Sequence, residues 1–265
     1  ATAKSKEKIF ETNKNGNLNL INLAIKYNIK KFIFFSTSAI FVKDYKKSVN
    51  EKTVTSPIET YGKSKVSAEI DLKNSRLKSW TIFRIPMIVS KNRIGVLSLL
   101  FDLIINHKRI PLLNKGENLL QFIHIDDLIK FILKSIKIKE KEIYNLASDE
   151  AISLKNLFLK LITSLNSKSR FIYFQDIGIT SFLSFLNFLN LSPLNIYHLK
   201  MLKFSLVMNT SKITKRYRMR PKISTSQMMI DALKSYKFSN RKLKNVTEIS
   251  SPIKMKILKL IYYLF

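Results

Sequence analysis

The segment Lys31-Phe-Ile-Phe-Phe-Ser-Thr-Ser38 is a short apolar run that ends in three hydroxyl side chains. An apolar run of this length is typical of a buried strand, and the polar residues after it indicate that the strand enters a loop. A second strand is predicted at Trp80–Ile85, where Pro86 stops it, and a third at Glu142–Leu146. Their largely apolar character predicts a parallel sheet that is covered on both faces.

Helical patterns of ten or more residues alternate with these strands. In chain order, we predict helices at Lys6–Tyr27, Thr60–Lys78, Val96–Asn106, from Asp126 or Asp127 as the cap to about Lys137, and Ser153–Leu165. This alternation predicts an α/β protein with a doubly wound parallel sheet and helices on both faces. After about residue 150 the alternation weakens, and we expect a strand at Phe171–Phe174 and helices at Thr180–Leu191 and Ser224–Tyr236.

The composition excludes several kinds of site. The 265 residues include no cysteine, which excludes disulfides, thiolate zinc sites and cysteine nucleophiles. The three histidines are too few and too scattered to form a histidine metal cluster, so we expect no metal site. The formal net charge of +29 comes from lysines spread along the whole chain. Because the lysines are spread out, codon bias explains the high charge better than a specific nucleic-acid partner does. The charge still favours the binding of anionic ligands.

The longest uncharged stretch runs from Ile177 to Leu199, and asparagines and a proline interrupt it. Such a stretch is a poor membrane span, and the polar, charged first residues are unlike a signal peptide. We therefore expect a cytoplasmic protein. The segment 239–265 is basic and then apolar, and we favour its packing on its own domain over contact with a membrane surface.

The motif Tyr61-Gly-Lys-Ser-Lys65 places a phenol and an ammonium on one face of a predicted helix. For a tyrosine to act as a base near pH 7, its pKa must fall from about 10 by roughly three units, or about 4 kcal/mol. A nearby ammonium favours the phenolate. Chance alone provides about one or two such pairs in a chain with this many lysines, and Tyr27 and Lys31 form another. Taken alone, the motif is explained by a pair of surface residues.

Other motifs surround this pair in a fixed order. They are Asn13-Lys-Asn-Gly16, Phe34-Phe-Ser-Thr-Ser-Ala-Ile-Phe41, Thr81-Ile-Phe-Arg-Ile-Pro86, Gln121-Phe-Ile-His-Ile-Asp-Asp-Leu128, Tyr144-Asn-Leu-Ala147, and Met208-Asn-Thr-Ser-Lys212 with Arg220-Pro221. Over about residues 9 to 236, this order and spacing resembles the extended short-chain dehydrogenase/reductase family. The likeness is greatest to its nucleotide-sugar 4-epimerases and 4,6-dehydratases.

The resemblance implies a Rossmann-like catalytic domain at residues 1–150. It also implies a smaller α/β substrate domain at 151–238, interleaved with the first in the family, and leaves a tail at 239–265. It implies a nucleotide-sugar substrate, NAD as the cofactor with NADP as the alternative, a homodimer, and a role in polysaccharide biosynthesis.

The resemblance also assigns residues. Tyr61 matches the catalytic tyrosine of the family, Lys65 matches the lysine that also holds the cofactor ribose, and Thr37 is the first choice for the catalytic hydroxyl. Ser36 and Ser38 are alternatives to Thr37, and capping of the backbone after a strand is the competing explanation for all three hydroxyls.

Further positions are implied to line the site. Besides Tyr61 and Lys65, the expected cofactor contacts are Ser36, Arg84 and Pro86, and the expected substrate contacts are Ser38, Met87 and Leu120. A structural ion pair is the competing explanation for Arg84. At His124 and Asp126 we favour helix capping by the aspartate over a role in binding.

The implied reaction is hydride transfer at C4 of the sugar. Tyr61 takes the proton of the 4-hydroxyl group while Thr37 hydrogen-bonds the same oxygen. Epimerase, dehydratase and reductase outcomes all stay open. The alternative is a non-catalytic family member used for binding or assembly. That alternative is favoured by Leu120, where many relatives carry arginine, and by the missing glycine-rich loop.

The five glycines form no Gly-x-x-Gly-x-x-Gly loop for a cofactor pyrophosphate. A sheet covered on both faces cannot begin at the strand near Lys31 without exposing an apolar edge. We therefore expect the coding sequence upstream of Ala1 to encode about 60 to 80 further residues that begin with a strand and this loop. Reading the genomic sequence checks this expectation. A stop codon directly upstream would contradict it and favour the non-catalytic alternative.

Overall fold

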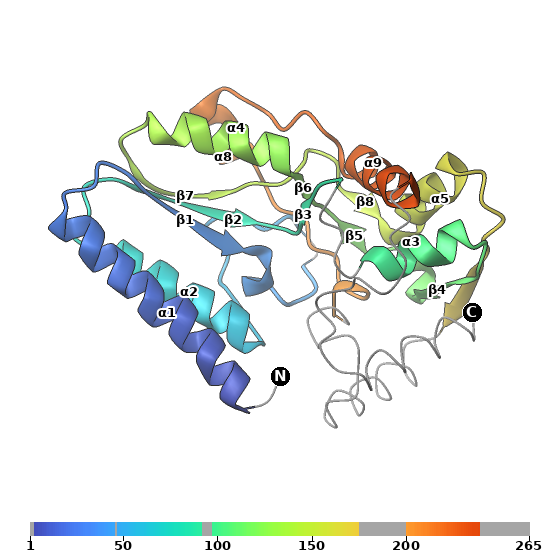
Figure 1. Cartoon of the computed structure of the whole chain (residues 1–265), viewed down its shortest axis with the longest axis horizontal. Coiled ribbons are helices and arrows are strands. Elements are labelled where there is room, and N and C mark those ends of the chain that lie inside the picture. Colours follow the sequence, from blue (N-terminus) through green and yellow to red (C-terminus); the bar gives the residue numbers. More distant parts are fainter. Residues whose placement is uncertain (1–2, 46, 92–96, 175–199, 239–265) are drawn as a thin grey trace. The chain divides into compact units, whose positions relative to one another are not determined.

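The computed structural model describes residues 3–45, 47–91, 97–174 and 200–238 (Figure 1). The chain divides into two compact units that are interleaved in sequence. Unit 1 takes Ala1–Ile88, Gln121–Asp149 and Leu206–Lys222, and unit 2 takes Val89–Leu120, Glu150–Ser205 and Ile223–Phe265. One division lies next to the expected boundary at residue 150. However, Val89–Leu120, before that boundary, belongs to unit 2, and Leu206–Lys222, after it, belongs to unit 1. The helix expected at Thr180–Leu191 and the tail at 239–265 lie outside the described residues.

A parallel sheet forms the centre of unit 1. Its strands are β1 (Phe32–Thr37), β2 (Trp80–Ile85) and β7 (Lys141–Asn145), in the order β1-β2-β7. All six residues of β2 are buried, as expected for a central strand. The limits of β2 are those predicted, because the apolar run ends at a proline. β1 continues two residues beyond its apolar run, because Ser36 and Thr37 pair with Arg84 and Ile85.

Helices cover both faces of this sheet (Figure 1). One face carries α1 (Ala3–Lys26) and α2 (Thr60–Lys73), and the other carries α4 (Ile125–Ile136) and α8 (Ser211–Tyr217). Successive side chains of β2 point to opposite faces of the sheet, so they belong to two different hydrophobic cores. Ile82 packs with residues of α1 and α2, whereas Phe83 packs with residues of α4 and α8. The doubly wound parallel arrangement predicted from the sequence is confirmed.

Two helix ends differ from the prediction in ways that local hydrogen bonds explain. α2 stops at Lys73, five residues early, where the Ser75 hydroxyl donates to the carbonyl oxygen of Leu72 at 2.7 Å and the Asn74 amide donates to Ile70. The predicted aspartate cap of α4 is wrong, because the cap is His124, whose Nδ1 accepts from the Asp126 amide at 3.2 Å. A neutral imidazole nitrogen serves here as the acceptor that an aspartate oxygen usually supplies.

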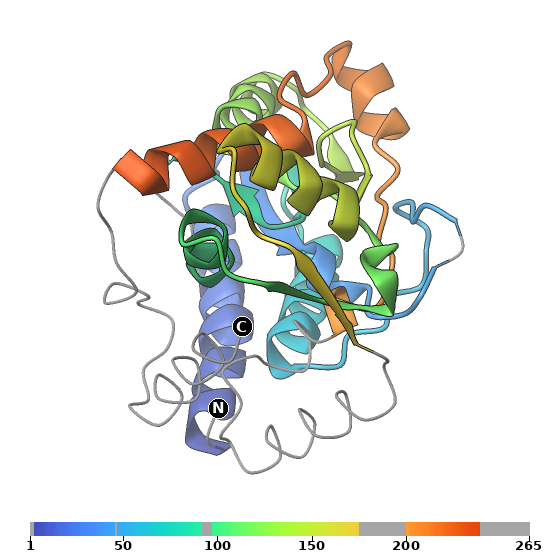
Figure 2. The same ribbon diagram turned by 90° about the vertical axis from the view of Figure 1, so that its right-hand side faces the viewer.

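Unit 2 is a second α/β assembly. Its elements are α3 (Leu97–Ile105), β4 (Ile110–Leu113), β5 (Leu119–Leu120), β8 (Ile152–Ser153), α5 (Leu154–Ser164), β9 (Phe171–Phe174) and α9 (Thr225–Phe238). β4 pairs with β9 in parallel, and β5 pairs with β8 in the antiparallel sense. Within this unit α9 packs against α5 and α3 (Figure 2). The helix predicted from Ser153 is present as α5, and Ser153 is its cap, since its hydroxyl accepts from the backbone amide of Asn156 at 3.2 Å.

The short strands were not predicted from the sequence. β3 (Ile88–Val89), β5, β6 (Ile123–His124) and β8 have two residues each, which is too short for a periodic pattern. β4 has four residues and includes Pro111, which argues against a strand in sequence reasoning. None of the described helices combines the length and the apolar character that crossing a membrane requires.

The glycines of α1 and α2 provide a matched test of the packing in unit 1. A Cβ at Gly62 of α2 would lie 2.7 Å from the carbonyl oxygen of Ala39, whereas a Cβ at Gly16 of α1 meets nothing within 4 Å. We expect Gly62→Ala to destabilise the fold by about 1–3 kcal/mol through overpacking. Gly16→Ala should stabilise it by up to about 1 kcal/mol through helix propensity. Urea denaturation measures both changes, and equal effects would contradict the close approach at Gly62.

Candidate functional site

Lys65 of α2 is held at the carboxyl end of β1. Its ammonium donates a hydrogen bond to the carbonyl oxygen of Phe35 at 2.9 Å. The same nitrogen lies 4.7 Å from the centre of the Phe34 ring and 5.9 Å from the centre of the Tyr61 ring. Burial lowers the pKa of Lys65 below its ordinary value of 10.5. Lys65 therefore points at the sheet edge instead of extending into solvent.

Tyr61 lies one helical turn before Lys65, and its side chain is 42% exposed. Two polar side chains fix the backbone of this turn. The Ser64 hydroxyl donates to the carbonyl oxygen of Tyr61 at 2.8 Å, and the Asn13 amide of α1 donates to the Ser64 hydroxyl at 3.1 Å. Tyr61 is thus partly exposed while its backbone is connected through Ser64 to α1.

The competing pair, Tyr27 and Lys31, has a different environment. Tyr27 follows α1 and is 67% exposed. The Lys31 ammonium donates to the carbonyl oxygen of Ile138 at 2.8 Å, and Ile138 precedes β7. Lys31 is therefore directed to the amino end of the sheet, away from the edge where ligands of open α/β sheets bind.

The three hydroxyls at the end of β1 have separate surroundings. Ser36 is 3% exposed and donates to Glu69 Oε1 at 2.5 Å. Thr37 accepts from the Ala39 amide at 3.1 Å and so caps the short 3₁₀ turn η1 (Ser38–Ile40). Ser38 is buried in that turn. A hydroxyl has one donor hydrogen and two acceptor lone pairs, so the cap occupies only acceptor capacity of Thr37.

Arg84 of β2 is 3% exposed and forms a buried ion pair with Glu69 of α2. Arg84 Nη2 donates to Glu69 Oε2 at 2.6 Å, and Nε donates to Oε1 and Oε2 at 3.0 and 3.2 Å. Nη1 donates to the carbonyl oxygen of Glu51 at 3.0 Å, and the guanidinium lies 5.5 Å from the centre of the Phe41 ring. These contacts make Arg84 an ion-pair residue in this structure. We call Ser36, Glu69 and Arg84 the Glu69 cluster.

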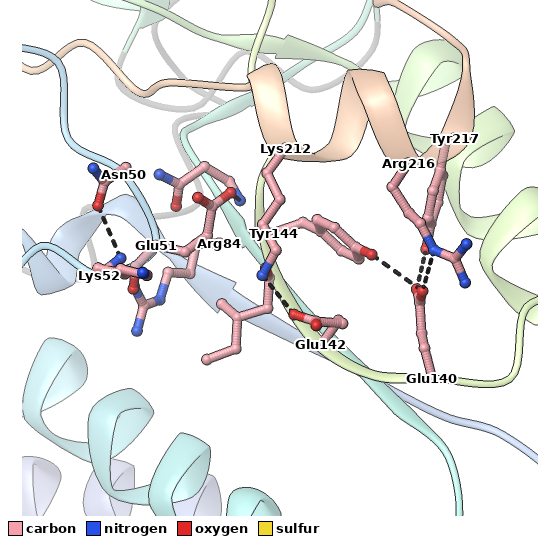
Figure 3. A network of polar contacts seen from close by, with 12 residues as sticks. Asn50, Glu51, Lys52, Arg84, Glu140, Glu142, Tyr144, Lys212, Arg216 and Tyr217 are labelled. Atoms are coloured by element: carbon pink, nitrogen blue, oxygen red, sulfur yellow. Dashed lines mark hydrogen bonds and ion pairs between the residues drawn. The ribbon is translucent and has the colours of Figure 1, made fainter.

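The loop 47–58, which precedes α2, is anchored beside the same sheet edge. The Asn145 amide N–H donates to Glu51 Oε1 at 2.9 Å, and the Asn145 side chain donates to the carbonyl oxygen of Val49 at 3.0 Å. Arg84 and Glu51 lie next to each other in this network (Figure 3). The backbone of Val49 also exchanges hydrogen bonds with Val207 and Asn209, each at 2.8 Å. This connection to a distant segment holds the loop that leads into α2.

The other expected residues lie in two places. Pro86 and Met87 are partly buried just after β2, and the Met87 carbonyl accepts from the Ile123 amide at 3.2 Å. Leu120 belongs to unit 2, where it is 6% exposed in β5 and pairs with Ile152. Sequence reasoning missed Glu69, Glu51 and Asn145. The spacing of Glu69, four residues after Lys65, was the available signal for a third residue on that helix face.

A second carboxylate lies at the amino end of the sheet (Figure 3). Glu140 precedes β7, and its side chain is 6% exposed. It accepts from the hydroxyls of Tyr144 and Tyr217, both at 3.1 Å, and from Arg216 Nε at 2.9 Å. Burial raises the pKa of Tyr144 and raises that of Tyr217 to about 12, so both phenols stay neutral near pH 7. We call these four residues the Glu140 cluster, and it ties α8 to β7.

No group of three or more acidic, histidine or cysteine residues that could hold a metal ion occurs in the described parts of the chain. The ionic groups at the sheet edge are instead arranged as donors and acceptors for one another.

Comparison with known proteins identifies the class. Residues 1–147 match the model of the NAD dependent epimerase/dehydratase family, and the chain belongs to this family. It is 30% identical over 267 residues to the uncharacterized protein y4nG of Sinorhizobium fredii, covering 98% of this chain and 67% of that protein. It is 28% identical over 178 residues to dTDP-D-glucose 4,6-dehydratase of Dictyostelium discoideum, covering 58% of this chain and 40% of that enzyme. The chain thus spans about two thirds of the first relative and less than half of the second.

Solved structures share the fold. UDP-glucose 4-epimerase of Thermotoga maritima, crystallised with UDP-glucose, superposes with a TM-score of 0.69 at 19% identity, covering 91% of this chain and 74% of that one. WbmG of Bordetella bronchiseptica, in complex with NAD and UDP, superposes with a TM-score of 0.70 at 16% identity, covering 92% and 70%. The Rossmann-like fold class predicted from the sequence is therefore confirmed.

Proposed function

We propose that this chain carries the catalytic residues of an NAD-dependent enzyme that acts at C4 of a nucleotide sugar. The observation that carries the proposal is the placement of Lys65 on the Phe35 carbonyl at the carboxyl end of β1, with Tyr61 one turn earlier on α2. Membership of the epimerase/dehydratase family supports this substrate class, as do the relatives that are named for UDP- and dTDP-sugars.

The proposed roles follow from the chemistry of the side chains. Tyr61 accepts the proton of the sugar hydroxyl, and its exposure leaves the phenol accessible to a ligand. The Lys65 ammonium, 5.9 Å from the ring centre, favours the phenolate electrostatically. The Thr37 hydroxyl donates a hydrogen bond to the oxygen that loses its proton, while its lone pair keeps capping Ala39.

The residues present fit the nicotinamide-ribose end of an NAD cofactor. A lysine ammonium has three donor hydrogens, and the bond to Phe35 uses one, so Lys65 has donor capacity for ribose hydroxyls. When bound, NAD would supply hydride transfer to and from the sugar carbon. NADP is the alternative, and RMD of Pseudomonas aeruginosa, which has a similar fold, has a solved structure in complex with NADPH. No residue is assigned to the pyrophosphate, because the five glycines form no Gly-x-x-Gly-x-x-Gly loop.

Ser36 and Arg84 take an indirect role in this proposal. The resemblance implies that both meet the cofactor, but both side chains are buried and bonded to Glu69. We assign them to holding α2 in place. Pro86 and Met87, which follow β2, and Ser38 in η1 keep their proposed places beside the ligand.

The second candidate is a non-catalytic family member used for binding or assembly. Leu120, which is buried in β5, favours it, because the resemblance implies an arginine at this position in many relatives, and a leucine cannot bind phosphate oxygens. An activity assay with nucleotide sugars separates the two candidates. The same assay identifies the sugar, the nucleotide and the reaction outcome.

We expect Tyr61→Phe to reduce kcat by at least about a hundredfold, because it removes the proton acceptor and keeps the ring. The fold should be unchanged, since the Tyr61 side chain is 42% exposed. The assay measures conversion of UDP- and dTDP-hexoses with NAD by the full-length protein. Tyr27→Phe is the matched control and should retain full activity. An active Tyr61→Phe enzyme together with an inactive Tyr27→Phe enzyme would place the site elsewhere.

A further inference from the structure

Tyr61, Lys65 and Glu69 follow one another at intervals of four residues along α2, so they share one face of the helix. The first two are the proposed catalytic pair, and the third is the most buried, with a side chain that is 2% exposed. Its carboxylate accepts from the Ser36 hydroxyl of β1 and from two nitrogens of Arg84 in β2. Glu69 therefore links this helix to two neighbouring strands at once.

Two consecutive residues of β1 hold two consecutive turns of α2. The carbonyl oxygen of Phe35 accepts from Lys65 at 2.9 Å, and the hydroxyl of Ser36 donates to Glu69 at 2.5 Å. A rotation of α2 about its axis, or a slide along the strand, would break both bonds together. The position of the Lys65 ammonium is therefore coupled geometrically to the bond made by Glu69.

Arg84 extends the same constraint to the segment before α2. Its Nη1 donates to the carbonyl oxygen of Glu51, and its guanidinium lies against the Phe41 ring. The loop 47–58 leads directly to the first turn of α2, where Tyr61 lies. One guanidinium thus fixes both the approach to Tyr61 and, through Glu69, the turn after Lys65.

Stability alone explains this arrangement poorly. Removing two charges from water costs several kcal/mol per ion, and apolar replacements of buried ion pairs are often at least as stable. A charged pair with several directional bonds instead selects one geometry among the many that apolar packing permits. The location of the pair, one turn from Lys65, indicates which geometry it selects.

We propose that Glu69, acting with Ser36 and Arg84, is a positioning residue that sets the orientation of α2 and thereby holds Lys65 and Tyr61 at the carboxyl end of β1. Glu69 makes no contact with the substrate or the cofactor in this proposal. The catalytic roles of Lys65 and Tyr61 rest on the proposed function. The coupling between Glu69 and Lys65 rests on the contacts within unit 1.

The test measures the titration of Lys65 directly. Lysines of the full-length protein are reductively methylated with ¹³C, and the Lys65 signal is assigned by its loss in Lys65→Arg. Burial lowers the pKa of Lys65, because it disfavours the charged form. If Glu69→Gln releases α2, Lys65 becomes hydrated and its pKa rises toward the ordinary value. Loss of the Glu69 negative charge alone would lower the pKa, so the sign of the change separates movement from electrostatics.

Two further variants complete the design. Ser36→Ala removes only one bond of the Glu69 cluster and keeps both charges, so it tests the proposal even if Glu69→Gln fails to fold. Its Lys65 pKa should also rise. Glu140→Gln is the matched control, because Glu140 is a buried carboxylate with three donors at the opposite end of the same sheet. It should leave the Lys65 titration unchanged.

The expected kinetic effect is a fall in kcat of at least about tenfold in Glu69→Gln and Ser36→Ala, since small displacements of catalytic groups cost up to about a hundredfold. An unchanged Lys65 titration in a folded Ser36→Ala variant overturns the proposal. An equal rise in Glu140→Gln also overturns it, because the effect would then be a general loosening of the sheet. If the titrations change as expected but Tyr61→Phe keeps full activity, the coupling holds and the proposed function fails.

Discussion

The buried ion pair between Glu69 and Arg84 is the interaction on which the site in unit 1 depends. It joins α2 to β2, and the Ser36 hydroxyl joins the same carboxylate to β1. The remaining nitrogen of Arg84 reaches the carbonyl oxygen of Glu51 in the loop before α2. Apolar packing of Ala68 and Leu72 against the sheet brings the helix close, and the ionic bonds then determine which of its residues face the sheet edge.

The two ends of the sheet use buried carboxylates differently. At the amino end, Glu140 collects two neutral tyrosines and Arg216, and it connects β7 with α8. At the carboxyl end, the Glu69 cluster lies beside Lys65, whose pKa burial lowers. Ligands of open α/β sheets bind at the carboxyl ends of the strands. The Glu140 cluster thus stabilises the fold. The Glu69 cluster lies at the end of the sheet where the proposed catalytic residues need a fixed geometry.

The sequence predicted the elements whose patterns are long or sharply ended. β2 was located to the residue, because a run of apolar side chains stops at Pro86, and the start of α5 was predicted at Ser153, which is its cap. Two-residue strands were missed, because no periodicity exists at that length. The cap of α4 was assigned to an aspartate, and the structure shows His124 in that place, since capping preferences are statistical and an unprotonated imidazole nitrogen can also accept the hydrogen bond.

Candidate site residues could be proposed from the sequence in part. The four-residue spacing and the order of the motifs were enough to select Tyr61 and Lys65. Sequence spacing could not reveal that Ser36 and Arg84 turn toward Glu69, because that depends on the pairing register of β1 and β2, in which Ser36 lies opposite Arg84. This register brings a hydroxyl and a guanidinium to the same carboxylate, at two positions where the resemblance implies cofactor contacts.

A crystal structure of the full-length protein with NAD and UDP tests the central claim most directly, because it shows what meets the ammonium of Lys65. The account predicts that a ribose hydroxyl of the cofactor accepts a hydrogen bond from Lys65 while the bond to Phe35 persists, with the phenol of Tyr61 open toward the sugar position. A cofactor bound away from Lys65, or a Lys65 side chain that leaves Phe35 to reach a nucleotide phosphate, would contradict it.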